Sequence, residues 1–317
     1  MTPTAQPKAP SVFADFPRAK GGFERDDCRV YVGDCRDWLA KLPAGAFDLI
    51  FADPPFNWNR DYDRHETGHA WDDAQTDDAY LDFTYEWLDL AAERLAPHGS
   101  LWVNIPDTWA AEIVVHLKQR GMFMVNWCVW HYRFGQNTRT RFINSKVHAL
   151  YFMKDPDHPD RRWNPEAVAE VSDRRAIYGD PRTENKKEGW LPPGHRVPMD
   201  VWYGRYWGRI QGNNKERRHK HDNQLPEVYL GRVINACSHE GDLVLDPFLG
   251  SGTTGTVARA LARNFVGIEY SKANAQHAWD RIVNKGPYRA EEIKGQRGVS
   301  TAIHPPRGGA WEGKLGT

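Results

Sequence analysis

The chain has 317 residues, which is enough for one large α/β domain with an insertion or for two smaller domains. Its hydrophobic content of 40% and charged content of 26% are those of an ordinary globular protein, and no apolar run approaches the roughly 20 residues that span a bilayer. The N-terminal stretch lacks the apolar core of a signal peptide, and the four cysteines form no C-x-x-C pair. These properties argue against a membrane protein or an exported disulfide-rich protein and favour a cytoplasmic one with reduced thiols.

The charges are balanced in number but unevenly distributed along the chain. Lys plus Arg and Asp plus Glu amount to 42 each. Residues 61–93 hold eleven acids and one base, residues 131–154 hold five bases and no acid, and residues 196–220 hold seven bases and two acids. Each run alone is compatible with an ordinary solvated surface. Together they suit a protein with a basic face that binds a polyanion.

The first half of the chain alternates between strand and helix patterns. Residues 1–22 are rich in Pro, Ala and Lys and are expected to form a loose arm. Strands are predicted over residues 28–34, 47–55, 100–107, 123–132 and 147–155, and helices over residues 35–43, 78–99 and 108–121. Such alternation predicts a mostly parallel sheet with helices on both faces.

The pattern breaks after residue 155 and resumes near residue 222. The stretch between is rich in Pro, Gly, Arg, Trp and Asn, and its tryptophans need somewhere to pack, so an insertion or small subdomain is predicted. Afterwards helices are predicted over residues 226–241, 253–264 and 272–286, and strands over residues 242–248 and 265–271. The predicted organisation is an arm (1–22), two halves of one domain (23–155 and 222–286), an insertion (156–221) and a tail without a core pattern (287–317).

The stretch "LDPFLGSGTTG" carries a glycine motif. From Gly250 to Gly255 it reads G-x-G-x-x-G, and Glu269 follows 19 residues after Gly250, which is a spacing typical of dinucleotide-binding folds. A nicotinamide-binding sheet, however, begins at this motif and adds several strands after it. Only one predicted strand follows here, and the others lie nearer the N-terminus. The motif therefore indicates a circularly permuted sheet, with a nicotinamide oxidoreductase as the alternative.

The second motif is "DPPF", from Asp53 to Phe56, at the end of a buried strand. Ligands of open α/β sheets bind outside such strand ends. Two prolines hold the backbone extended and remove two N–H donors, which leaves carbonyls and the Asp53 carboxylate as acceptors beside an aromatic ring. Acceptors next to a flat ring suit a planar heterocycle that carries an amino group. A Pro-Pro turn with a capping Asp and a core Phe is the alternative.

In this order the two motifs resemble those of the DNA amino-methyltransferases. In the permuted β-type arrangement of that family, D-P-P-[YFW] comes first, the recognition region follows, and the F-x-G-x-G donor motif comes last. The resemblance covers roughly residues 27–285 and departs from the family at Gln224-Leu225-Pro226, where Gln-Lys-Pro is usual. It implies an α/β fold with a Rossmann-like seven-stranded methyltransferase sheet, circularly permuted, and a target-recognition insertion at residues 156–221. It also implies S-adenosylmethionine as the methyl donor.

The resemblance also implies roles for single residues. Gly250 and Gly252 would let the backbone approach the donor's methionine portion, and Glu269 would accept hydrogen bonds from the ribose hydroxyls. Asp53 and the Pro54 carbonyl would accept the two hydrogens of an exocyclic amine, aiming its lone pair at the methyl group. The remaining residues implied in catalysis or donor binding are Pro55, Phe56 (stacked on the base), Asp34, Asp246, Pro247, Phe248, Thr253, Tyr270 and Gln224.

The implied partner is double-stranded DNA, from which the target base must be flipped out. In the family, Asp at the first position of the motif goes mainly with adenine N6 and Ser with cytosine N4. Adenine N6 is therefore expected, and cytosine N4, an RNA target or a catalytically silent nucleic-acid-binding protein are the alternatives. The resemblance makes a homodimer possible without fixing the oligomeric state. No metal is expected, because His65 and His69 fit a solvated loop. DNA contacts are predicted for Asn57, Trp58, Arg133, Arg139, Arg141, Arg205, Arg209, Lys215, Arg217 and Arg218. Asn57, Trp58 and Tyr62 belong to a loop that could close over the pocket.

Overall fold

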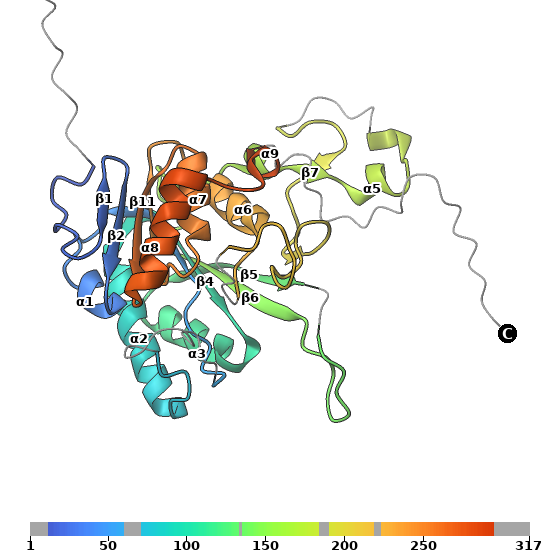
Figure 1. Ribbon diagram of the computed structural model, residues 1–317. Helices are drawn as coiled ribbons and strands as arrows, with labels where there is room; N and C mark the ends of the chain where they lie inside the picture. The colour runs from blue at the N-terminus through green and yellow to red at the C-terminus, as the bar shows by residue number, and fades with distance from the viewer. Residues whose placement is uncertain (1–11, 60–70, 133–134, 184–189, 219–222, 295–317) are drawn as a thin grey trace, which may run out of the picture.

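A computed structural model of the chain describes residues 12–59, 71–132, 135–183, 190–218 and 223–294. Within these ranges a nine-stranded sheet runs through the molecule (Figure 1). Its strands, in spatial order, are β1 (Phe23–Arg25), β2 (Cys28–Val32), β11 (Asn264–Glu269), β10 (Leu243–Asp246), β3 (Phe47–Ala52), β4 (Leu95–Ile105), β6 (Lys146–Met153), β5 (Phe123–His131) and β9 (Val201–Trp202).

The strand directions confirm the predicted sheet. Strands β2, β11, β10, β3 and β4 are parallel, and β6 runs antiparallel to both β4 and β5. These seven strands form the predicted sheet, to which β1 and β9 add one short strand at each edge. Strands β10 and β11 come last in the chain yet lie between β2 and β3, so the chain order is permuted, as the position of the glycine motif predicted.

Helices cover both faces of the sheet (Figure 1). One layer contains α1 (Cys35–Leu39), α2 (Asp77–Arg94) and α3 (Asp107–Gln119), and the other contains α6 (Glu227–Cys237), α7 (Thr253–Ala260) and α8 (Lys272–Asp280), which continues into the π-helical turn η2 (Arg281–Lys285). Asp34, Thr76 and Ser271 begin α1, α2 and α8 with side-chain oxygens that accept a backbone N–H of the first turn. Because β3 lies between two helical layers, it is buried almost throughout, as its continuous apolar run predicted.

One predicted boundary was wrong. The helix predicted over residues 78–99 ends at Arg94, and β4 begins at Leu95 rather than near residue 100. Leu95 pairs with Phe47 of β3, and Pro97 cannot continue a helix. The pairing between strands therefore outweighs the helical pattern here.

The ends of the predicted domain extend further than expected. Phe13, in the predicted loose arm, is buried in the core, with the Arg29 guanidinium over its ring at 4.8 Å. Ile293, in the predicted tail, is fully buried in α9 (Ala290–Lys294), and its carbonyl accepts a hydrogen bond from Asn235 of α6 at 2.9 Å. Described residues on both sides of the predicted domain thus pack onto it. Single apolar residues within polar stretches gave no periodic signal.

The predicted insertion is partly integrated into the main sheet. Its Trp202 lies in β9 and is buried together with Trp207, whereas Trp163 and Trp190 are exposed. The rest includes α4 (Pro165–Val168), α5 (Asp173–Ala176), η1 (Pro181–Thr183) and the small sheet of β7 (Glu170–Val171) with β8 (His195–Arg196). In Figure 1, α5 and β7 lie in a lobe at the side of the main body.

In the part of the chain that the structure describes, no helix has the length and apolarity needed to cross a membrane. Within the same ranges no group of His, Cys, Asp and Glu is arranged to hold a metal ion. His65 and His69 lie outside the described residues. All four cysteines are buried and free.

Candidate active site

The two sequence motifs meet at one edge of the sheet. Strands β3 and β10 are parallel neighbours, with Leu49 and Ile50 paired to Val244 and Leu245, so the loops that follow them begin side by side. We call residues 53–56 the catalytic loop and residues 246–253 the donor loop. Both line one pocket, which also contains the end of β11 and the start of α1.

Asp53 is the first residue after β3 and is half-buried in this pocket. Its Oδ1 accepts a hydrogen bond from the Asn104 amide at 2.6 Å, and the Asn104 oxygen accepts one from the Tyr229 hydroxyl at 3.1 Å. Burial raises the pKa of Asp53 to about 7, and the charge of Asp246 adds to this effect. The Asn104 hydrogen bond and the positive charge of Arg209 act in the opposite direction.

The backbone of the catalytic loop is held from the α2–α3 layer. The Tyr80 hydroxyl donates to the Pro55 carbonyl at 2.6 Å, and the Trp109 indole N–H donates to the Phe56 carbonyl at 2.9 Å. Two of the carbonyls that the sequence left without partners are therefore occupied. Among the described residues no donor reaches the Pro54 carbonyl, so it and the Asp53 carboxylate are the acceptors that this loop offers to a ligand.

The residues after Phe56 form a tightly bonded turn. The Asp73 carboxylate accepts the backbone N–H groups of Asn57 and Trp58 at 2.9 and 3.0 Å. The Asn57 amide exchanges two hydrogen bonds of 2.9 Å with the backbone of Gln75, and Asn57 has a left-handed φ of 56°. Its side chain therefore shapes the turn, and its predicted contact with DNA stays a prediction. Trp58 packs edge-on against Phe56, with ring centroids 5.1 Å apart, and Tyr62 lies outside the described residues.

Two carboxyl groups shape the donor loop. Asp246, at the end of β10, is buried and accepts the Phe248 N–H at 2.9 Å. Burial raises its pKa to about 6. Glu269, at the end of β11, accepts the N–H of Gly250 at 2.8 Å and that of Ser271 at 3.0 Å. Two backbone donors thus hold the Glu269 carboxylate in one orientation at the wall of the pocket.

The structure shows why glycine suits the donor loop. Gly250 and Gly252 have φ values of 49° and 74°, in the left-handed region that favours glycine. A Cβ at Gly252 would lie 2.9 Å from the Cβ of Ala278 in α8. Close packing against α8 and the left-handed backbone conformation therefore both favour glycine at residue 252.

Asp34 lines the pocket from the start of α1. Its carboxylate accepts the backbone N–H of Arg36 at 2.9 Å and pairs with the Arg36 guanidinium at 2.8 Å. Burial tends to raise the pKa of Asp34, but the Arg36 hydrogen bonds outweigh burial and keep the pKa below its usual range. Asp34 is therefore ionised at neutral pH and positioned beside the donor loop.

Comparison with known proteins agrees with this geometry. The family model described as DNA methylase matches residues 47–279, which include both loops. The chain belongs to this family of DNA methylases. It is 32% identical to the type II methyltransferase M.BamHI of Bacillus amyloliquefaciens over 283 residues, covering 86% of the chain but 61% of the length of M.BamHI.

Solved structures of methyltransferases share the fold. The PvuII DNA methyltransferase, described as cytosine-N4-specific, aligns with a TM-score of 0.58 at 16% identity. The alignment covers 84% of the present chain and 90% of the PvuII chain. The complex of M1.HpyAVI with S-adenosylmethionine aligns with a TM-score of 0.52 at 22% identity over 81% of the methylase and 99% of its own chain. At these identities the likeness concerns the fold.

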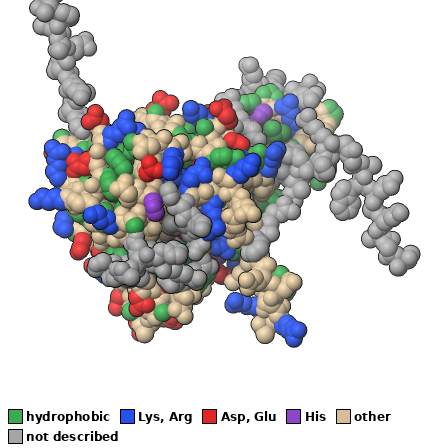
Figure 2. All heavy atoms as spheres, viewed as in Figure 1, with side chains coloured by type: hydrophobic (Ala, Val, Ile, Leu, Met, Phe, Trp, Pro, Cys, Tyr) green, Lys and Arg blue, Asp and Glu red, His purple; other side chains and the backbone are tan. Residues whose placement is uncertain are grey.

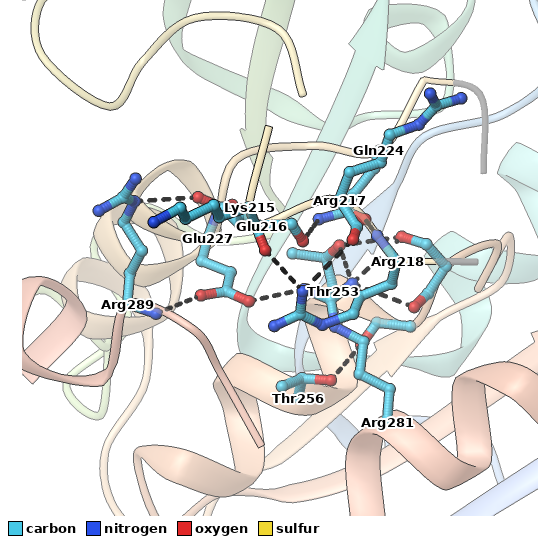
Figure 3. A network of polar contacts seen from close by, with 12 residues as sticks. Lys215, Glu216, Arg217, Arg218, Gln224, Glu227, Thr253, Thr256, Arg281 and Arg289 are labelled. Carbon is cyan, nitrogen blue, oxygen red and sulfur yellow. Dashed lines mark hydrogen bonds and ion pairs between the residues drawn. The ribbon is translucent and has the colours of Figure 1, made fainter. Parts of the chain in front are cut away.

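The predicted donor-binding residues of the methylase do not all reach the pocket. Asp34, Asp246, Pro247, Phe248, Gly250, Thr253, Glu269 and Tyr270 line it. Gln224 is not among these lining residues. It is buried, its amide donates to the Glu216 carbonyl at 2.8 Å, and its oxygen accepts the Arg218 N–H at 2.9 Å (Figure 3). Gln224 therefore holds the chain around Glu216 and Arg218 in place. The Thr253 hydroxyl accepts a hydrogen bond from Arg281 at 2.9 Å.

The basic residues that are predicted to contact DNA fall into two groups. Arg139 and Arg141 are exposed on the connection between β5 and β6, which projects from the body in Figure 1 and carries basic side chains at its tip in Figure 2. Because β5 runs parallel to β3, this connection starts from the same sheet edge as the catalytic loop. Arg133 lies outside the described residues.

The second group comes from the recognition segment, by which we mean residues 205–218. Arg205 and Lys215 are exposed, whereas Arg217 and Arg218 are half-buried and donate to nearby backbone carbonyls. Arg209 is linked to the pocket: it donates to Asn223, which lines the pocket, at 2.7 Å, and its charge acts on Asp53.

Several residues of the site were missed by sequence reasoning. Asn104 sits at the carboxyl end of β4, next to β3, and a polar residue in a buried strand was a signal that could have identified it. Trp71 and Phe83 line the pocket, and Tyr80 and Trp109 hold the catalytic loop. These four aromatic residues resemble ordinary core residues in the sequence, so no local signal separated them.

Proposed function

We propose that this DNA methylase transfers a methyl group from S-adenosylmethionine to the N6 amine of an adenine flipped out of duplex DNA. The observation that carries the proposal is the side-by-side placement of the catalytic and donor loops in one pocket. The pocket offers two acceptors to a ligand, the Asp53 carboxylate and the Pro54 carbonyl, beside the aromatic ring of Phe56.

S-adenosylmethionine supplies an electrophilic methyl group on a sulfonium. Its fit is supported by the character of the pocket: the carboxylates of Asp34 and Glu269 lie where polar groups of a nucleoside can be bound, and Phe248 and Trp71 provide apolar walls. The family match and the M1.HpyAVI complex support the same donor. Glu269 would accept the ribose hydroxyls while its backbone donors hold it in place.

The amine of adenine is a poor nucleophile because its lone pair is delocalised into the ring. Asp53 and the Pro54 carbonyl, by accepting the two amine hydrogens, would favour a pyramidal nitrogen with a localised lone pair. This role requires Asp53 to be ionised, because a protonated carboxyl offers fewer acceptor sites. Asn104 and Arg209 favour the ionised form. Positioning of the two reactants then lowers the activation barrier by an amount on the order of 7–11 kcal/mol.

The choice of adenine rests on Asp53 at the first position of the motif. Cytosine N4 is the second candidate, since the PvuII enzyme, which shares the fold, is described as cytosine-N4-specific. In both cases the target base leaves the duplex, at a cost of a few kcal/mol. Arg139, Arg141 and the recognition segment would contact phosphates, and residues 156–221 would form the target-recognition region.

The experiment that tests the proposal is methylation in cells. The chain is expressed in a host without DNA methyltransferases, and the genomic DNA is sequenced with single-molecule modification detection and digested for nucleoside mass spectrometry. N6-methyladenine at one sequence context, absent with Asp53→Ala, supports the proposal. N4-methylcytosine instead would refute the adenine assignment and leave methyl transfer intact. Methylated RNA with unmodified DNA would refute the DNA target.

A further inference from the structure

A buried cluster of two carboxylates and two guanidinium groups lies behind the donor loop (Figure 3). Glu216, Glu227 and Arg281 have fully buried side chains or nearly so, and Arg289 is mostly buried. The four residues come from the recognition segment, the start of α6, the turn η2 and the segment before α9. The cluster therefore joins parts of the chain that are far apart in sequence.

Arg281 connects this cluster to the donor loop. Its Nη1 donates to the Ser251 carbonyl at 3.1 Å and to the Thr253 hydroxyl at 2.9 Å, and its Nη2 donates to Glu227 at 2.7 Å. Ser251 and Thr253 both line the pocket. One planar guanidinium thus fixes the end of the donor loop relative to α6, which a single-point cation such as lysine cannot do in the same way.

Glu227 and Glu216 carry the connection onward to the recognition segment. The backbone N–H of Glu227 donates to the Glu216 carboxylate at 2.7 Å. Arg289 bridges the two acids: its backbone N–H donates to Glu227 at 2.7 Å, and its side-chain Nε donates to Glu216 at 3.1 Å. The Arg289 guanidinium also lies over the Tyr206 ring at 3.8 Å. The cluster therefore anchors the recognition segment at two places, Glu216 and Tyr206.

Stability alone is a weak reason for such a cluster. Buried ion pairs are often no more stable than apolar side chains of the same size, because removing charges from water is costly. What they provide is a defined geometry, and here the geometry relates the donor loop to a segment whose neighbouring side chains, Lys215 and Arg217, carry positive charge toward the surface.

We propose that Arg281 is a positioning residue for the donor loop and that, through Glu227 and Glu216, it couples donor binding to DNA binding by the recognition segment. The inference rests on the proposed function. By linkage, DNA bound at the recognition segment strengthens binding of the donor, and the donor strengthens binding of DNA by the same factor.

The positioning role is tested with Arg281→Lys, which keeps the charge and loses the planar fork. The dissociation constant of S-adenosylhomocysteine, measured by calorimetry without DNA, is expected to rise about tenfold. The KM for S-adenosylmethionine should rise similarly, while kcat at a saturating donor concentration changes little. The matched control is Arg263→Lys: Arg263 is also buried and fork-bonded, to Ser238 and Leu261, away from the pocket. Its donor affinity should stay at the wild-type value even if its melting temperature falls.

Unchanged donor affinity in Arg281→Lys, or equal losses in the two variants, would overturn the positioning role. Failure of the wild-type protein to bind S-adenosylhomocysteine at all would instead overturn the proposed function. The two failures are therefore distinguishable.

The coupling is tested with Glu216→Gln and a duplex that carries the site identified by sequencing. In the wild type, this duplex should tighten S-adenosylhomocysteine binding about fivefold or more. In Glu216→Gln, the DNA-free affinity should stay within about twofold of wild type and the tightening should largely vanish. Arg289→Lys, which retains the charge and loses the contacts with Glu216 and Tyr206, gives the same test if Glu216→Gln does not fold. Equal binding with and without DNA in the wild type, or tightening retained in the variants, would refute the coupling.

Discussion

The ionisation of Asp53 can be tested through the hydrogen bond that Asn104 donates to it. Asn104→Ala removes a 2.6 Å hydrogen bond to a group whose pKa burial raises to about 7. Since Asn104 favours the carboxylate, its loss should raise the pKa of Asp53 further. Hydrogen bonds to charged groups contribute about 1.5–3 kcal/mol, and 1.36 kcal/mol corresponds to one pH unit. The midpoint of the Asp53 titration should therefore move upward by roughly one to two pH units.

The sign of the effect on the reaction follows from the acceptor role. Only the carboxylate accepts the amine hydrogens, so kcat/KM for DNA should rise with pH through about 7 in the wild type and level off above it. At pH 7 about half of the wild-type protein is ionised at Asp53. An upward shift of one pH unit leaves about one tenth ionised, so kcat/KM at pH 7 should fall about fivefold and recover at pH 9.

The assay is transfer of a radiolabelled methyl group to duplex DNA, measured from pH 5.5 to 9.5 at constant ionic strength. Ser100→Ala is the matched control, because Ser100 lies in the same strand and bonds to the Tyr151 hydroxyl rather than to Asp53. Its midpoint should equal that of the wild type. A uniform loss of rate in Asn104→Ala with an unmoved midpoint would refute the reasoning, because ionisation of Asp53 would not control the reaction.

Three further changes test the donor loop and the DNA surface. Gly252→Ala should lower the free energy of unfolding in urea by roughly 2–4 kcal/mol, because it combines a left-handed φ with a contact of 2.9 Å to Ala278. Gly241→Ala, left-handed but in open space, should cost only about 1–2 kcal/mol, and equal losses would contradict the packing argument. Glu269→Gln should weaken S-adenosylhomocysteine binding about tenfold in calorimetry, since an amide offers one acceptor oxygen in place of two; unaltered affinity would remove Glu269 from the donor site. In the double variant Arg139→Gln and Arg141→Gln, the slope of log K for DNA against log salt should become less steep by about 1.8 if each arginine neutralises one phosphate, and an unchanged slope would place DNA elsewhere.

The sequence predicted those parts of the site that depend on local pattern and strand order. Asp53 and Glu269 each end a buried apolar strand, and the carboxyl ends of parallel strands meet at one edge of a sheet. Their proximity followed from this rule once the permutation was recognised. The same rule placed Asp246, at the end of β10, and the donor loop that follows it at this edge.

Other parts depend on contacts that no local pattern encodes. Gln224 matched a family motif yet serves to brace the recognition segment, because Glu216 and Arg218 fold back onto it. Gly252 was assigned to ligand clearance, and the structure adds a second constraint from Ala278, which follows it by 26 residues. In both cases the residue type was informative, and the folded chain reveals a contact partner that the local sequence pattern does not encode.

The catalytic motif is therefore an incomplete description of the catalytic group. Placing Asp53 and Asp246 at the ends of adjacent strands brings two carboxyl groups into one pocket, where burial and mutual repulsion favour a protonated Asp53. The groups that oppose this come from outside the motif: Asn104 from β4 and Arg209 from the recognition segment. Because Arg209 belongs to the segment expected to meet DNA, the ionisation of Asp53 depends on how that segment is positioned. Two proteins that share the D-P-P-F motif are therefore expected to differ in activity near neutral pH if they differ at Asn104 or Arg209.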